Sequence, residues 1–175
     1  MIDTAKFKPK TVYVTYISAT PEKVWQALTD PVFTRRYFFG FAIDVEPKTG
    51  GVFLLRYPDG RVHARGVVVD WSPPRRFSST WLIEGMGDFD ALPECLVTYD
   101  IERSGEAVRL TMTEAHSWDV PDDILAGGRS GWPAVLSNLK SVLETGQSLT
   151  LAETGPPPGM VEAVKKAVAE KPWLK

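Results

Sequence analysis

The chain has 175 residues, of which 43% are hydrophobic and 11% aromatic, and its 20 Lys and Arg residues are balanced by 22 Asp and Glu residues. This length is enough for about one domain with its own core, and so many aromatic residues exclude a disordered chain. A net charge of −2 argues against a dedicated nucleic-acid binder, which needs a basic surface. With a single cysteine, no signal-peptide pattern and no apolar run of about 20 residues, we expect a cytoplasmic protein without a membrane segment.

The first predicted element is a strand at residues 11–18, where β-branched and aromatic residues alternate. Thr20 and Pro21 are typical of a helix start, and apolar residues then recur at helical spacing as far as Leu28. Asp30-Pro31 ends this helix and begins a second short one that reaches Tyr37.

Beyond Gly40 the apolar period changes to two, which is typical of strands. Turns rich in Gly and Pro separate the segments, and one longer loop is expected at residues 84–93. The six predicted strands lie at residues 41–46, 52–57, 62–71, 76–83, 94–102 and 107–115. Short connections favour an antiparallel meander.

The next predicted element is a long amphipathic helix that begins near Ser130 and ends at Gly146. The glycine-rich residues 127–131 are predicted to form a flexible loop before it, which gates the mouth of a pocket. Residues 147–154 are compatible with a strand or a loop. Residues 155–159 have the composition of a linker, and residues 160–171 form an amphipathic helix that docks on its own domain, on a second copy of the chain or on another protein.

This order predicts an α+β fold with a seven-stranded antiparallel sheet curved around the long helix and two short helices after the first strand. We expect residues 1–147 to form the domain and residues 148–175 to form a C-terminal extension. Because a helix cannot touch the whole concave face of such a sheet, an apolar pocket is predicted between the two.

Several short motifs resemble a known family when they are taken in order. They are residues 18–31, Gly50-Gly51-Val52-Phe53, Pro58-Asp59-Gly60, residues 73–77, Thr80-Trp81, Gly131-Trp132 and residues 143–146. Over roughly residues 10–147 the chain resembles the bacterial homologues of the C-terminal domain of the heat-shock-protein-ninety ATPase activator, which belong to the START-like, or SRPBCC, superfamily. The resemblance implies the helix-grip fold and allows a stress-response role.

The predicted ligand-binding residues combine large apolar walls with a few polar tips on the inward faces of the strands and the long helix. They are Phe39, Phe53, Tyr57, Trp81, Tyr99, Met112, Glu114, His116, Trp132 and Leu136. For most of the aromatic residues, a plain role in the core explains the pattern equally well.

Glu114 shares a strand face with Leu110 and Met112. Either it is buried and paired, with Arg56, Arg65 or His63 as partner, or the strand bends and the carboxylate reaches water. The two histidines and Cys95 have no spacing typical of a metal site, and Cys95 is interpreted as a small buried residue. No metal, cofactor or catalytic triad is predicted.

Three functions remain open at this point. The first is a non-catalytic protein that binds a small hydrophobic or amphipathic molecule between sheet and helix. The second is a chaperone cofactor or protein-interaction module, either as a homodimer or beside a chaperone. The third is an enzyme of the START-like cyclase or hydrolase type, with Glu114, Tyr99 or His116 as acid or base.

Overall fold

The computed structural model describes residues 2–152 and 155–175. It has a seven-stranded antiparallel sheet in the order β1-β7-β6-β5-β4-β3-β2. The strands are β1 (Lys8–Ile17), β2 (Ala42–Val45), β3 (Val52–Arg56), β4 (Val62–Ser72), β5 (Arg76–Ile83), β6 (Cys95–Ser104) and β7 (Ala107–His116). The predicted seven-stranded sheet is confirmed, with strand ends that differ by up to three residues.

Four α-helices accompany the sheet, together with the short 3-10 helices η1 (Thr4–Lys6), η2 (Gly87–Ala91) and η3 (Pro172–Leu174). The α-helices are α1 (Pro21–Thr29), α2 (Pro31–Tyr37), α3 (Asp122–Thr145) and α4 (Met160–Glu170). Thr20 caps α1 through the Lys23 amide, and Asp30 caps α2 through the Val32 amide, so both predicted helix starts are confirmed.

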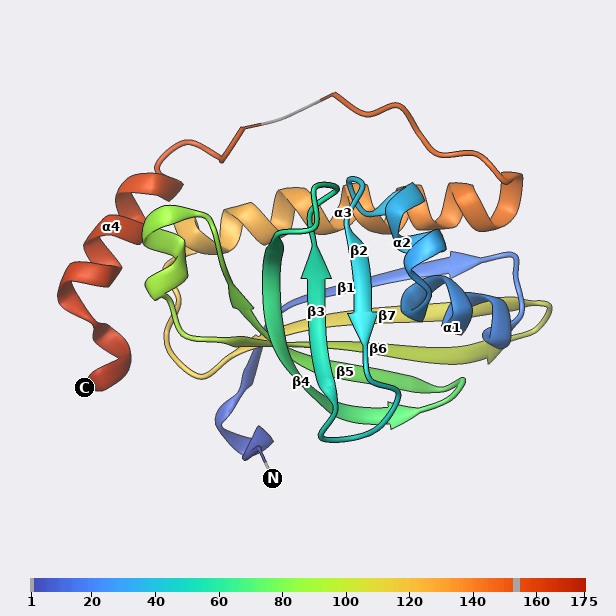
Figure 1. Ribbon diagram of the computed structural model, residues 1–175, viewed down its shortest axis with the longest axis horizontal. Coiled ribbons are helices and arrows are strands. Elements are labelled where there is room, and N and C mark those ends of the chain that lie inside the picture. Colours follow the sequence, from blue (N-terminus) through green and yellow to red (C-terminus); the bar gives the residue numbers. More distant parts are fainter. Residues whose placement is uncertain (1, 153–154) are drawn as a thin grey trace.

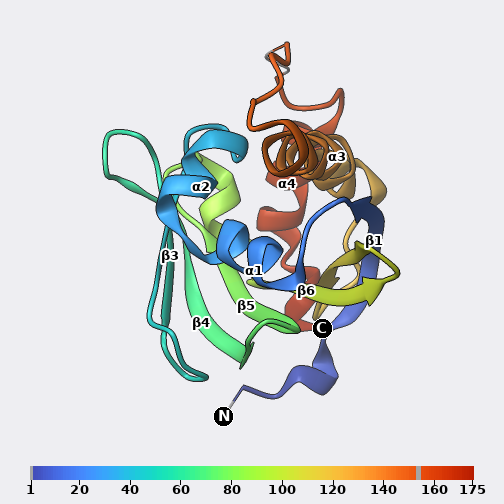
Figure 2. The ribbon, with the colours of Figure 1, turned by 90° about the vertical axis from the view of Figure 1, so that its right-hand side faces the viewer.

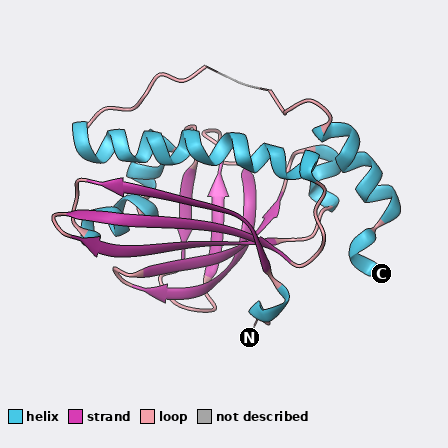
Figure 3. Cartoon of the chain, turned by 180° about the vertical axis from the view of Figure 1, so that it is seen from behind, coloured by secondary structure: helices cyan, strands magenta, loops and turns pink. Residues whose placement is uncertain are grey.

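The sheet curls under α3, which lies across its concave side (Figure 1). The end-on view shows α1 and α2 closing one side of the curl (Figure 2), and the view from behind shows α3 running along the sheet (Figure 3). The concave side chains of the strands and the inner face of α3 form one core of aliphatic and aromatic residues. Burial of this apolar surface is the main contribution to the stability of the fold.

Helix α3 is longer than predicted, because it begins at Asp122 and not near Ser130. The prediction of a flexible gating loop at residues 127–131 is therefore wrong. Asp122 and Asp123 lie in the first turn, where acidic side chains complement the helix dipole. Gly127 and Gly128 are tolerated inside the helix because other elements pack directly against them, as described below.

A second, smaller core lies at one end of the molecule, where α4 packs against η2 and the first turns of α3. Its buried residues are Trp118, Val120, Ile124, Leu125, Val164 and Ala167. Residues 147–152 and 155–157 form neither helix nor strand. Residues 153 and 154, for which a strand or a loop was expected, lie outside the described residues.

Candidate functional site

Most of the predicted ligand-binding residues lie together in the main core between the sheet and α3. Phe53, Trp81, Tyr99, Met112, Trp132 and Leu136 are all at most 8% exposed. Their rings pack closely: the Trp81 centroid lies 5.0 Å from that of Phe53 and 5.7 Å from that of Trp132. The Tyr99 ring lies 6.4 Å from the Trp132 ring.

Two predicted residues lie elsewhere. The hydroxyl of Tyr57 is 3.0 Å from Nδ1 of His63, and Phe41 stacks on the same imidazole. Burial lowers the pKa of His63. Phe39 adopts a positive φ of 50° and is 56% exposed, so its ring lies against solvent and not in the core.

Glu114 is buried on the concave face, and two side chains hold its carboxylate. Nε1 of Trp132 donates to Oε2 at 2.5 Å, and Nε2 of His116 lies 2.9 Å from Oε1. Because a carboxylate only accepts hydrogen bonds, the second contact forms with the proton on Nε2 of His116. The predicted partners are wrong, since Arg56 pairs with Asp44 and Arg65 pairs with Glu84.

The strand register explains how this group assembles. Thr11 of β1 and Val97 of β6 lie opposite Glu114 on either side, and Cys95 lies opposite His116. Residues paired across antiparallel strands share a face. We refer to Thr11, Cys95, Glu114, His116 and Trp132 as the polar centre.

Gly128 of α3 places the helix backbone next to the carboxylate of Glu114. A Cβ atom at this position would lie 2.8 Å from Oε2 of Glu114. A side chain at this position would force the carboxylate or the helix to shift, so glycine permits this close approach. Gly127, the preceding residue, packs in the same way against Met160 of α4.

The polar centre has hydrogen-bonding capacity that the described residues do not use. Oγ1 of Thr11 and Nδ1 of His116 are buried without a partner among them. Burial and the nearby charge of Glu114 raise the pKa of Tyr13. The same two causes raise the pKa of the Cys95 thiol, so the thiol stays protonated at neutral pH and is a poor nucleophile.

The core side chains of the sheet and of α3 pack against one another. A surface groove of about 930 Å³ lies elsewhere, between the N-terminus of α1, the β4–β5 turn and strands β6 and β7. A smaller hollow of about 380 Å³ lies beside Gly50 and Val68. Neither is lined by residues of the polar centre.

Within residues 2–152 and 155–175, no group of three or more His, Cys, Asp or Glu side chains is placed to hold a metal ion. Over the same residues, no helix is both long and apolar enough to cross a membrane.

Sequence reasoning identified Glu114, His116 and Trp132 but missed Thr11 and Gly128, and it did not place Cys95 beside them. The two-residue spacing of Glu114 and His116 indicates that they share a strand face. The contacts made by Thr11 and Gly128 depend on the β1–β7 register and on the position of α3, for which the sequence carries no local signal.

A seven-stranded antiparallel sheet that curves around a long helix defines the START-like helix-grip class of proteins. The family model described as "Activator of Hsp90 ATPase homolog 1-like protein" matches residues 18–144. The chain belongs to this family. No curated protein matches the sequence.

Solved structures with this fold extend the comparison. CalU16 from Micromonospora echinospora is 22% identical over 91% of this chain and 83% of its own, with a TM-score of 0.62. Protein MLL2253 from Mesorhizobium loti is 28% identical over 76% of this chain and 96% of its own, with a TM-score of 0.61. The Aha1 dimer from Colwellia psychrerythraea is 19% identical over 78% of this chain and 97% of its own, also with a TM-score of 0.61.

Proposed function

We propose that the chain binds a small amphipathic molecule between its sheet and α3, as a non-catalytic carrier-type or stress-response protein of the cytoplasm. The apolar part of the molecule lies among the buried rings of Phe53, Trp81, Tyr99 and Trp132. Its polar part lies at the polar centre. The observation that carries the proposal is the buried Glu114 carboxylate beside polar atoms without partners.

Ordinary cores avoid such a group, because a buried charge and unpaired polar atoms cost free energy. Ligand sites have this composition: a largely apolar lining with a few polar groups that fix the orientation of the ligand. Since the side chains between the sheet and α3 pack against one another, the proposal requires them to rearrange when the ligand enters. The ligand would enter at the end of the molecule that α4 and η2 close. These elements are held by a small core of their own, so they can move without disturbing the main core.

Titration with the neutral dye N-phenyl-1-naphthylamine tests this function. We expect saturable one-to-one binding that quenches tryptophan emission. Trp81→Phe and Trp132→Phe weaken binding several-fold, because both rings line the proposed site. Trp25→Phe is the matched control, since Trp25 packs on Trp71 at a centroid distance of 4.9 Å and lies outside the polar centre. Absence of saturable binding, or equal weakening by all three variants, contradicts the proposal.

A second candidate is a protein-interaction or chaperone-cofactor role, which the family description favours. The observation in its favour is a row of exposed apolar side chains on the edge strand β1, formed by Val12, Val14 and Tyr16. Stimulation of the ATPase of a purified bacterial Hsp90 supports this role. Loss of this stimulation in a Val12→Ser/Val14→Ser variant places the interaction surface on β1. No stimulation at saturating protein counts against it.

A further inference from the structure

We infer that the ligand of the polar centre carries a protonated amine, a primary ammonium group, on an aromatic or apolar body. This inference rests on the proposed function and names the chemical class that the site selects. Three features of the described structure support it: an acceptor-rich polar centre, basic side chains that are engaged elsewhere, and aromatic rings packed on Trp132, which contacts the carboxylate.

The first step concerns hydrogen-bond chemistry. The carboxylate of Glu114 only accepts hydrogen bonds, and the N–H group at Nε2 of His116 donates to it. Nδ1 of a neutral His116 is then also an acceptor, as is the hydroxyl oxygen of Thr11. Both atoms are buried without a partner among the described residues. An ammonium group has three donors and no acceptor, so it complements this set.

The second step concerns charge. Basic side chains occupy positions next to the polar centre, but within the described part of the chain none pairs with Glu114, and each contacts another group. They are Lys8 with the Ala5 carbonyl (3.1 Å), Lys10 with Asp119 (2.8 Å) and Arg129 with Asp122 (3.1 Å). Among residues 2–152 and 155–175, the one ion-pair contact of the carboxylate is with the imidazole of His116. A buried carboxylate is stabilised by a cation that hydrogen-bonds to it, and the ligand supplies that cation.

The third step concerns the surroundings. Trp132, which donates to Glu114, also packs edge-on against Trp81, Phe38 and Tyr99. Aromatic faces attract cations and accept flat apolar groups. Gly128 brings the α3 backbone close to the carboxylate, which limits the size of any head group that reaches it. The ammonium group is more compact than a guanidinium.

Calorimetric titration with two isosteric ligands, naphthalen-2-ylmethanamine and naphthalen-2-ylmethanol, tests the inference. The amine is expected to bind the wild-type protein at least about tenfold more tightly than the alcohol, since it alone brings a positive charge to the carboxylate. Glu114→Gln brings the two affinities within about twofold of each other by weakening the amine. Glu102→Gln is the matched control, because Glu102 pairs with Arg109 on the outer surface, and it leaves the ratio unchanged.

The outcomes separate this inference from the proposed function. If the alcohol binds as tightly as the amine or more tightly, the inference fails and the proposed function stands. If neither ligand binds, both fail. The wild-type ratio decides the inference even if Glu114→Gln does not fold, and Thr11→Val, which removes one acceptor, then serves as the second variant with an expected loss of about threefold for the amine alone.

Discussion

Gly128 shows how a single residue sets the distance between α3 and the carboxylate of the polar centre. It lies in the interior of α3, where glycine costs about 1 kcal/mol relative to alanine. Its missing Cβ lets the helix lie against Oε2 of Glu114. Gly131, three residues later on the same helix, has open space around its own Cβ position. The two positions therefore allow the same substitution to be compared in different surroundings.

We expect Gly128→Ala to lower the free energy of unfolding by about 1–3 kcal/mol, because the new methyl group collides with a buried carboxylate. Gly131→Ala is expected to raise it by up to about 1 kcal/mol, since only the helix propensity changes. Urea unfolding followed by circular dichroism measures both. Equal stabilities of the two variants would falsify the close approach of α3 to Glu114.

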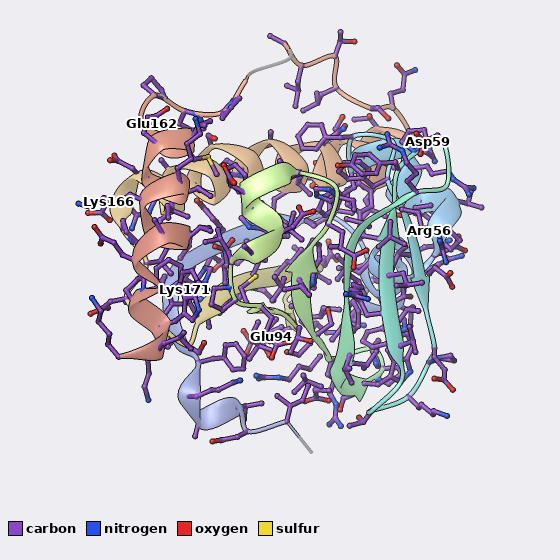
Figure 4. The ribbon with its side chains drawn as sticks, turned by 60° about the vertical axis from the view of Figure 1, so that its left-hand side comes forward. Arg56, Asp59, Glu94, Glu162, Lys166 and Lys171 are labelled. Atoms are coloured by element: carbon purple, nitrogen blue, oxygen red, sulfur yellow. The ribbon has the colours of Figure 1, made fainter. Side chains whose placement is uncertain are left out.

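Helix α4 is the element that closes the end of the molecule beside the polar centre. It packs on η2 and α3 through a core of its own, and the side chain of Val164 is fully buried there. The ring of Trp118 meets that of Trp173 at a centroid distance of 5.2 Å in the same region. Figure 4 shows Lys166 on the side of α4 that faces away from the rest of the molecule. Because the two cores are distinct, α4 is expected to open without unfolding the sheet.

Val164→Asp places an unpaired charge in the small core, at a cost of about 3–5 kcal/mol. The expected result is undocking of α4, with faster amide hydrogen exchange in η2 and the first turns of α3 and greater quenching of Trp118 and Trp173 by acrylamide. Strands β5, β6 and β7 keep their protection. Val161→Asp is the control, since Val161 is 38% exposed. Equal loss of protection in the sheet contradicts the independence of the two cores.

At the scale of the whole molecule, buried tyrosine hydroxyl groups make the free energy of unfolding depend on pH in the alkaline range. Burial raises the pKa of Tyr99 above its ordinary value of 10.0, and burial together with the neighbouring Tyr99 raises the pKa of Tyr37. The folded chain therefore holds these protons at a pH where the unfolded chain releases them. Their contribution to stability is complete below about pH 10 and is lost as the pH rises above it.

We expect the free energy of unfolding to fall between pH 9 and pH 11. Tyr99→Phe reduces that fall by about 1 kcal/mol, because one of the ionising groups is gone. Tyr16→Phe, at a position that is 51% exposed, leaves the fall unchanged. Guanidinium unfolding at each pH measures the difference. A fall of the same size in the Tyr99 and Tyr16 variants would show that Tyr99 does not contribute.

The sequence by itself determined the strands, α1, α2, the end of α3 and most of the core, because apolar periodicity, caps and turn residues are local signals. It also determined that Glu114 and His116 share a face. Only the tertiary structure decided that α3 continues back to Asp122, since contacts with Glu114 and Met160 compensate for its glycines. It also decided the burial of Glu114 and its partners, because the cross-strand register and the position of a packed helix are non-local.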